Sequence, residues 1–384
     1  MDARTAWGSL LMTALVGCGG VAANNERGSS KDQPSVDAGT GGDTTTPSQG
    51  TAGSEPTTIG VGGMPGIAGT TGVDIGGSSN PVPSTPDEIT VSNLTFAFGK
   101  FVAIGVRRDH GVYAGIVMTS ADGETWEERV KLSQGSAISL AFGGEHLVVL
   151  VRIDSSAGEA LVSADAVAWS HVSLPSGEPW TMAFGNGMFL VGTATAYVRS
   201  TDGLSWQSQV DAVGGSGLVF AGGHFVDYGS GLTVRTSDGT GPWQSVQIAP
   251  DASSGANGTA IQRLESGPQG FRAVTRHWCC FGETPNSDTF ASYRSADGLS
   301  WSSDEAGLPP SLSTLLEAPG RCLAEDARAG TLWFGADCTG VAQVAEGAGP
   351  ATGAFGNGRY VVAGKTGVLY SADGVTWIAN SLLN

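Results

Sequence analysis

From residue 94 to the C-terminus, short apolar runs alternate with glycine-rich turns. The clearest unit is Ala183–Gly192 (AFGNGMFLVG), in which an Ala-Phe pair is followed by a glycine turn and then by a second apolar run. Short runs of this kind, bounded by Gly and Asn residues, are typical of β-strands joined by tight turns. The pattern therefore predicts a series of β-hairpins, because similar units begin at Ala97, Ala141, Phe220 and Ala354.

A second pattern, Ser-x-Asp-Gly-x-x-Trp, follows most of these hairpins. The Asp can accept hydrogen bonds from the amides of the tight turn that it opens, and the Gly allows a positive φ. The Trp ring can then bury a large apolar area between neighbouring sheets. Four copies are complete, and the others have Ala166 for the Gly, one extra residue before Trp243, or no Trp after Asp337. The residues that this motif predicts to be structural are Asp122, Trp126, Asp165, Trp169, Asp202, Trp206, Asp238, Trp243, Asp297, Trp301, Asp337, Asp373 and Trp377.

The spacing of the motifs predicts the fold. Successive motif Asp residues lie 36 to 59 residues apart, and a recurrence of ~40 residues is the size of a four-stranded propeller blade. Seven such units predict an all-β fold, a seven-bladed β-propeller of four-stranded antiparallel blades, over residues 86–384. An apolar segment at Ile89–Val91 precedes the first unit. We expect it to pair with the last blade, in competition with the strand at Trp377–Leu383 or in addition to it.

The motif resembles the Asp-box (BNR) repeat of the sialidase-like β-propellers, over about residues 94–384. In this chain the Gly follows the Asp directly, whereas the usual motif of the family has one residue between them. The resemblance implies the propeller fold, and it implies that a site would lie on the face opposite the motifs. Sialidase activity is not implied, because the Arg-Ile-Pro or Arg-Leu-Pro tripeptide of that family is absent before the first motif, and Arg152-Ile153-Asp154 matches it only in part.

On that opposite face we expect the loops between second and third strands and the loops between blades. The fifth blade is longer than its neighbours, and its insertion mixes aromatic, cationic and acidic residues, which is typical of a binding loop. The alternative is a neutral insertion held by cysteines. If the chain is a hydrolase, Asp109 and Glu283 are candidates for the acid/base pair, although no catalytic residue is assigned. The candidate binding residues are Arg107, Arg108, Asp109, His110, Arg152, Asp154, Arg276, His277, Trp278 and Glu283, with Asp227 and Tyr228 from the fourth blade.

The N-terminal region has a different composition. A twelve-residue apolar run at Ala6–Gly17 is the length of a secretory signal core, and it ends directly before Cys18. This junction resembles the lipobox of bacterial lipoproteins, which implies a signal peptide at 1–17 and acylation of Cys18. Gly19, rather than Asp, follows the cysteine, and in that family this favours the outer membrane. The alternative is an ordinary signal peptide with an incidental cysteine. Residues 18–85 are rich in Gly, Ser, Thr and Pro and contain no aromatic residue, so we expect a disordered tether.

Four cysteines follow Cys18, an even number that predicts disulfides in an exported protein. Three pairings are possible. We favour Cys322 with Cys338, because both flank strands of the sixth unit, which lacks its Trp, and this leaves Cys279 with Cys280 as a vicinal pair. The alternative joins the insertion of the fifth blade to the sixth blade.

The charge narrows the possible partners. The net charge of −17 argues against a nucleic-acid binder and against docking on anionic lipid through basic residues. The five histidines show no metal-ligand spacing and there is no glycine-rich phosphate loop, so we expect no metal and no cofactor. The hypothesis is a monomeric, lipid-anchored outer-membrane protein, with the membrane side left open, that binds a surface glycan or an envelope protein without catalysis. The alternatives are a sialidase-like glycoside hydrolase and an assembly factor for a membrane complex.

Overall fold

The computed structural model of the chain describes residues 88–382, apart from residues 110–111, 176, 210–214, 216, 230, 250–258, 278–288, 319, 327, 347–350, 366 and 381. The predicted signal peptide, Cys18 and the predicted tether therefore lie outside the described residues. The described residues also leave out His110, Trp278, Cys279, Cys280 and Glu283. None of the segments described forms a helix that is long and apolar enough to cross a membrane.

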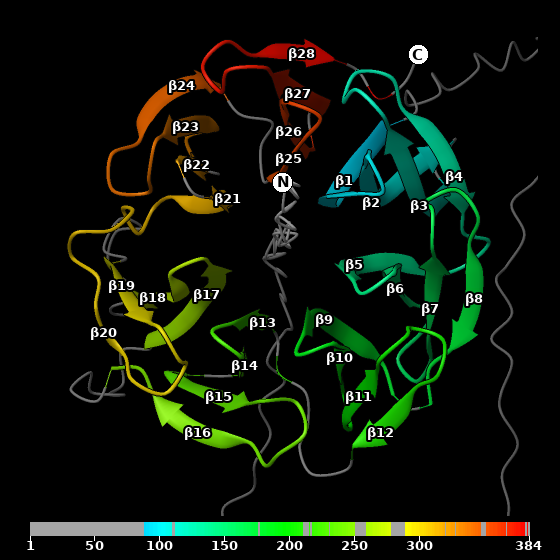
Figure 1. Cartoon of the computed structure of the whole chain (residues 1–384), viewed down its shortest axis with the longest axis horizontal. Coiled ribbons are helices and arrows are strands. Elements are labelled where there is room, and N and C mark those ends of the chain that lie inside the picture. The colour runs from blue at the N-terminus through cyan, green and yellow to red at the C-terminus, as the bar shows by residue number, and fades with distance from the viewer. Residues whose placement is uncertain are drawn as a thin grey trace, which may run out of the picture. The chain divides into compact units, whose positions relative to one another are not determined.

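Seven four-stranded antiparallel sheets surround a common axis, which confirms the predicted all-β, seven-bladed propeller (Figure 1). The first strand of each blade lies nearest the axis and the fourth lies at the rim. Blade by blade, the strands are β1 (Glu88–Ala97), β2 (Lys100–Asp109), β3 (Val112–Ser120), β4 (Glu127–Lys131); β5 (Ser136–Gly143), β6 (His146–Arg152), β7 (Gly158–Ser163), β8 (Ser170–Ser173); β9 (Pro179–Gly185), β10 (Met188–Thr193), β11 (Tyr197–Ser200), β12 (Gln207–Gln209); β13 (Gly217–Ala221), β14 (His224–Tyr228), β15 (Thr233–Ser237), β16 (Gln244–Gln247). The remaining strands are β17 (Thr259–Gly267), β18 (Gly270–His277), β19 (Thr289–Ser295), β20 (Ser302–Ser303); β21 (Ser313–Ala318), β22 (Arg321–Asp326), β23 (Thr331–Gly335), β24 (Ala342–Glu346); β25 (Ala351–Gly356), β26 (Arg359–Gly364), β27 (Gly367–Ser371) and β28 (Ile378–Asn380).

The apolar runs of the sequence are the second strands of the blades. In β6 the five residues between His146 and Arg152 are all fully buried, because a middle strand has a neighbouring blade on each of its two faces. The rim strand β4 (EERVK) has no fully buried residue and is polar. The core is consequently a set of apolar layers between successive blades rather than a single centre.

The register of the first hairpin corrects the predicted alignment of the repeats. Phe96 pairs with Phe101 in the same way that Phe184 pairs with Phe189, so the first copy of the hairpin pattern is Thr95-Phe96-Ala97 and not Ala97-Phe98-Gly99. Phe98 lies in the turn with a φ of 52°, close to the 48° of Asn186 at the equivalent turn position. A phenylalanine in a left-handed turn is uncommon, so the sequence favoured placing Phe98 in a strand and the alignment shifted by two residues.

The predicted closure of the ring is wrong. Residues Ile89–Val91 belong to β1, where they pair with residues 105–107 of β2: Ile89 lies opposite Arg107 and Val91 opposite Gly105. They therefore do not join the last blade. The last blade is completed by its own four strands, β25 to β28. The reason is length: β2 continues to Asp109 and offers β1 a partner along its whole course. Every blade is therefore formed from consecutive strands, and no strand among the described residues crosses the closure.

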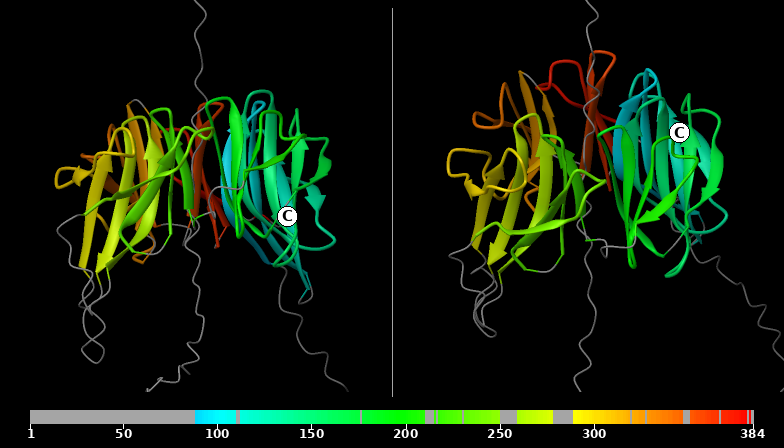
Figure 2. Two further views of the ribbon diagram at one scale, coloured as in Figure 1. Left: turned by 90° about the horizontal axis from the view of Figure 1, so that it is seen from below. Right: turned by 60° about the horizontal axis from the view of Figure 1, so that its bottom comes forward.

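The two ends of the ring carry different turns. We call one end the motif face: it carries the turns between first and second strands, such as Phe98-Gly99, and those between third and fourth strands, such as Ala121–Trp126. The other end, the hairpin face, carries the connections between second and third strands. Figure 2 shows the strands of the first and fifth blades extending farthest toward the hairpin face, in agreement with the ten-residue β2 and the eight-residue β18.

Candidate functional site

The turns that contain the repeated motif share one hydrogen-bonding scheme. In the first blade, Oδ1 of Asp122 accepts the amides of Glu124 and Thr125, each at 2.8 Å, and Oγ of Ser120 accepts the amide of Gly123 at 2.7 Å. Nε1 of Trp126 donates to the carbonyl of Gly123 at 3.2 Å. In the last blade the amides of Thr376 and Val375 lower the pKa of Asp373 to about 2. These carboxylates are fixed, ionised acceptors that hold turns.

The motif Trp residues pack against the blade that precedes them around the ring. Trp206, for example, joins a buried cluster that contains Val148 and Val162 of the second blade. In the second blade, where the motif has Ala166 in place of the glycine, the alanine adopts the same left-handed conformation, with a φ of 60°. The motif residues predicted to be structural therefore hold turns and seams between blades.

The sixth blade replaces its Trp with a disulfide. Cys322 and Cys338 are bonded, with their Cα atoms 5.1 Å apart. Cys338 directly follows Asp337, whose Oδ1 still accepts the amides of Thr339 and Gly340, both at 3.0 Å. This is the pairing favoured from sequence, and the partner states of Cys279 and Cys280 lie outside the described residues.

The candidate residues of the first two blades lie on the hairpin face, but their charges are engaged locally. Arg107 forms an ion pair with Glu128 at 3.2 Å, and Asp109 forms one with Lys131 at 3.4 Å. Arg152 pairs with Glu178 of the next blade at 3.3 Å. These pairs link neighbouring strands and blades instead of converging on one pocket.

Asp154 has a purely local role. Its Oδ1 accepts the amides of Ser156 and Ala157 at 2.7 and 2.9 Å. These hydrogen bonds, with the Ser156 amide first, keep the pKa of Asp154 below its usual value. Asp154 thus stays ionised as the acceptor of its own turn.

The end of the long hairpin of the first blade is apolar and exposed. Val112 and Tyr113 are both 68% exposed, the largest exposed fractions among the described large apolar side chains. The guanidinium of Arg108 lies 5.8 Å from the centre of the Tyr113 ring, within cation–π range. An aromatic ring beside an Arg at the tip of a projecting hairpin is a common composition for a binding surface.

The fifth-blade candidates lie on the same face but in a distant blade. Arg276 and His277 end β18, and Nδ1 of His277 lies 2.7 Å from Oγ1 of Thr259 on the neighbouring strand. The rest of the insertion is outside the described residues. Two blades on one side and three on the other separate this blade from the first (Figure 1). The structure therefore places the candidates of the first and second blades in neighbouring blades of one face, in separate ion pairs, and those of the fifth blade at a distance from both.

Asp227 is not a surface residue, contrary to the sequence-based expectation. It is fully buried on β14, where it forms an ion pair with Arg235 at 2.7 Å and a hydrogen bond with the hydroxyl of Tyr197. Trp243 stacks on Tyr197 with ring centres 4.3 Å apart. Asp227 thus belongs to the seam between the third and fourth blades. Its neighbour Tyr228 lies partly exposed at the end of the same strand.

Two successive seams, on either side of the fifth blade, depart from a pattern found in the other blades. In five blades a phenylalanine is the second-last residue of the first strand to pair with the second strand. In three of these seams its ring covers the glycine that ends the first strand of the neighbouring blade. A Cβ built on Gly185, for example, would collide with the ring of Phe220. The fifth and sixth blades have Ser266 and Glu317 at this position. The five phenylalanines are Phe96, Phe142, Phe184, Phe220 and Phe355.

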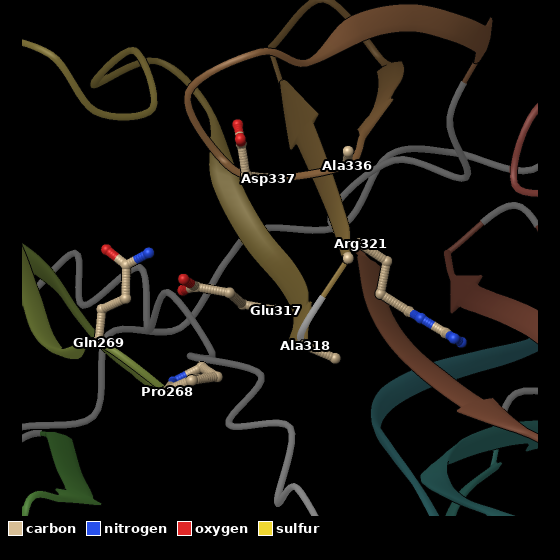
Figure 3. A pocket seen from close by; sticks show the side chains of 8 residues that line it. Pro268, Gln269, Glu317, Ala318, Arg321, Ala336 and Asp337 are labelled. Carbon is tan, nitrogen blue, oxygen red and sulfur yellow. The ribbon is translucent and has the colours of Figure 1, made fainter.

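Glu317 therefore stands where five of the seams have an aromatic ring. Its Oε2 lies 2.5 Å from the point at which a Cβ on Gly267 would be built, so it covers that glycine as the rings cover theirs. A depression of about 130 Å³ lies beside it, between the first turns of the fifth and sixth blades (Figure 3). It is lined by Pro268, Gln269, Glu317, Ala318, Gly320, Arg321, Ala336 and Asp337.

The cations near Glu317 are committed to other partners. Nε of Arg294 donates to Asp304 at 2.7 Å, and Nη1 of Arg272 donates to the buried Glu265 at 3.0 Å. Arg321 points away from Glu317 in Figure 3, and its guanidinium lies 3.9 Å from the centre of the Phe355 ring. Burial raises the pKa of Glu317, an effect that nearby Arg294 opposes.

Sequence reasoning missed this depression. The signal was present, because an alignment of the seven hairpins at the phenylalanine position isolates Ser266 and Glu317 as exceptions. The alignment needed the true register of each hairpin, and the shifted reading of the first copy obscured it. Within the described part of the chain, no group of three or more His, Cys, Asp or Glu side chains could hold a metal ion.

Comparisons with known proteins show the fold and no more. No family model and no curated protein matches the chain. Among solved structures, the chain is similar to a streptogramin B lyase, with 10% identity and a TM-score of 0.52 over 74% of this chain and 93% of that one. It is also similar to a catalytically inactive virginiamycin B lyase from Staphylococcus aureus with quinupristin, with 10% identity and a TM-score of 0.53 over 74% of this chain and 94% of that one. At these identities the likeness is one of propeller architecture.

Proposed function

We propose that this chain is an envelope lipoprotein whose propeller binds a surface glycan or another envelope protein without chemical change. The observation that carries the proposal is the exposed tip of the first blade, where Tyr113 and Val112 are each 68% exposed beside Arg108. Tyr and Arg are the side chains that dominate binding energy at recognition surfaces. The hairpin face would present this tip, together with the insertion of the fifth blade, to the partner.

The ion pairs, hydrogen bonds and ionisation of the acidic residues near this tip favour a binding role over hydrolysis. Asp109 is ion-paired with Lys131, and Asp154 is the acceptor of its own turn. A glycosidase needs a carboxylic acid held in its protonated form beside a second carboxylate. Asp154 has a lowered pKa, the opposite of that requirement.

The proposal also includes the assignment of the repeats to the Asp-box class and the location of the protein at the outer membrane. The scheme of Asp122, Ser120 and Trp126 is that expected of an Asp-box turn, and it supports the assignment of these repeats to the Asp-box class. The Gly17-Cys18 junction supports acylation of Cys18 and attachment to the outer membrane through residues 18–85. Labelling cells with an alkyne analogue of palmitate should modify the native protein and leave Cys18→Ser unlabelled.

A binding experiment on the hairpin face tests the main proposal. Tyr113→Ala should weaken binding to a glycan array, or recovery of envelope partners by crosslinking, by at least about tenfold, since a hot-spot truncation costs roughly 2 kcal/mol or more. Ile378→Ala is the matched control, because Ile378 is 52% exposed on the rim strand β28 of another blade. Equal binding by native protein, Tyr113→Ala and Ile378→Ala would contradict the assignment of this tip.

The hydrolase alternative has a separate readout. A panel of aryl-glycosides should show no turnover by the purified protein. Turnover that disappears in Asp109→Asn, with the fold intact by circular dichroism, would overturn the non-catalytic reading.

A further inference from the structure

The depression between the fifth and sixth blades can be compared directly with two sister seams. In the seam between the third and fourth blades, Nδ2 of Asn186 donates to the carbonyls of Gly223 and Asp238 at 2.8 and 2.9 Å. In the seam between the last and first blades, Asn357 makes the same two bonds to Gly99 and Ala121, at 3.0 and 2.9 Å. Each amide group thus bridges the first turn and the motif turn of the next blade.

The fifth blade has no such donor, and the same is true of the first, second and fourth blades, where Phe98, Gly144 and Gly222 take this position. The strand register places Pro268 at the position of Asn186, and a proline side chain donates no hydrogen bond. By strand register, Gly320 and Ala336 correspond to the residues whose carbonyls accept from Asn186 and Asn357, and both line the depression. The seam therefore lacks the side-chain amide that binds the corresponding carbonyls in the two Asn seams.

The ring that would fill the space is also absent, and an acid replaces it. Glu317 takes the place of the seam phenylalanine, so a negative charge is added where the apolar filling is lost. Asp337 adds a second carboxylate at the rim, and its Oδ1 is the acceptor of the motif turn. Figure 3 shows Glu317 directed toward Gln269, while Arg321 is directed away from it. The depression is thus lined by two carboxylates and by the amide of Gln269, whose oxygen accepts from Arg294, while the guanidinium of Arg321 lies against Phe355 of the next blade.

We infer that this depression is a binding site for a guanidinium or primary ammonium group, on the motif face and independent of the proposed binding tip on the hairpin face. Such a group supplies several N–H donors and one positive charge, which match the two carbonyls and the carboxylate of Glu317. The volume of about 130 Å³ admits a group of a few heavy atoms, such as the end of an arginine or lysine side chain. The net charge of −17 for the whole chain favours cations over anions as ligands.

The pH dependence of binding has a defined sign. Glu317 must be ionised to hold a cation, and burial raises its pKa. The charges that face it are Arg294 and Arg272, which oppose this rise, and Glu265 and Asp304, which add to it. Binding should therefore weaken as the pH falls, before the motif carboxylates, whose pKa values are lowered, begin to protonate.

The test uses the full chain with methylguanidinium chloride as the probe, and sodium chloride at equal ionic strength as the blank. The probe should raise the melting temperature saturably, because a ligand that binds only the folded state stabilises it. Glu317→Gln should weaken the apparent affinity at least tenfold. Glu145→Gln is the matched control, since Glu145 lies exposed in the first turn of the second blade and carries the same charge.

A second variant protects the test against a folding defect. Pro268→Asn places a side-chain amide donor in the first turn of the fifth blade and should weaken the response to the probe while keeping the charge of Glu317. An arginine-containing hexapeptide as a second probe distinguishes the source of the group: tighter binding than methylguanidinium indicates a partner's side chain, and no binding by the peptide indicates a free small cation. Equal responses of native protein, Glu317→Gln and Pro268→Asn, or an equal response to sodium chloride, would overturn the inference.

Discussion

The glycine of the repeated motif has two separable roles, a backbone conformation and a close approach between blades. Gly203 and Gly187 share a φ of +74°, so an Ala at either position would meet similar backbone strain. A Cβ on Gly203 would lie 2.7 Å from Cγ2 of Val148 in the preceding blade, whereas a Cβ on Gly187 would have no heavy atom within 4 Å. The two glycines thus form a matched pair, one at a seam and one in open space.

Gly203→Ala should therefore destabilise the protein more than Gly187→Ala. Both variants lose about 1–2 kcal/mol to the left-handed backbone, and only Gly203→Ala adds the roughly 1–3 kcal/mol of overpacking against Val148. Urea unfolding of the two variants measures the difference. Equal shifts of the midpoint would mean that the motif glycine is required by the turn alone.

Glu325 is a buried acid with an incomplete set of partners. It is 1% exposed on β22, its Oε2 accepts the amide of Ala351 at 2.9 Å, and no described residue donates to its Oε1. Burial raises the pKa of Glu325 from 4.5 to about 7. Between these two values the folded chain binds more protons at this site than the unfolded chain does, so its contribution to stability declines as the pH rises.

Glu325→Gln should remove this decline, because the amide stays neutral at every pH. The native protein should lose up to about 3 kcal/mol of unfolding free energy between pH 4.5 and 7.5 through this residue, and the variant should be the more stable of the two at pH 8. Chemical unfolding of both proteins at pH 5 and pH 8 measures the effect. Glu346→Gln, at an exposed acid on the rim strand β24, should follow the native pH profile.

The sixth blade shows how one sheet can replace a lost anchor. It lacks the motif Trp and carries the Cys322–Cys338 disulfide, which closes a loop with a sequence separation of 16. Both sulfurs belong to a buried cluster with Leu308, Leu312 and Ala324, so the bond lies in the same apolar layer that the Trp serves elsewhere. The covalent link and the apolar contacts together hold β22 to the motif turn.

Loss of this bond should destabilise the chain by about 2–4 kcal/mol, as expected for a disulfide that closes a loop of this size. Cys322→Ala with Cys338→Ala should show the loss in urea unfolding, and reduction should reproduce it in the native protein. Proteolysis without reductant, followed by mass spectrometry, should recover one linked peptide that contains Cys322 and Cys338. A link from either residue to Cys279 or Cys280 would be incompatible with the structure.

The sequence predicted the blades well because their signals are local and repeated. The Asp-Gly turn at Asp122, for instance, depends on residues within one hairpin, and its copies fix the period of the ring. Two predictions failed where the answer depended on register: the alignment of Phe98 and the partner of Ile89–Val91. The role of Glu317 was missed for the same reason, since its position opposite Gly267 becomes visible only when two blades are placed side by side.

The closure of the ring depends on side chains, because every blade is built from consecutive strands. Between the last and the first blade, Asn357 bridges two carbonyls, Arg359 forms an ion pair with Glu124, and Nδ2 of Asn380 donates to the carbonyl of Glu124 at 2.6 Å. A shared apolar cluster that includes Val361 and Ile116 lies beneath these contacts. The closing seam thus has the contacts of the other seams without a chain connection across it.

Asn357→Ala should therefore loosen the ring more than Asn186→Ala, although each variant removes the same two hydrogen bonds. The third and fourth blades are joined by the chain, which keeps them near each other after a contact is lost, whereas the last and first blades are neighbours only while the whole ring is intact. Hydrogen exchange should show faster opening of β1 and β25 in Asn357→Ala, by about fivefold or more for a loss of roughly 1 kcal/mol, and little change in β9 and β13 in Asn186→Ala. If the two variants exchange alike at their own seams, the chain connection adds nothing and the ring is held by packing alone.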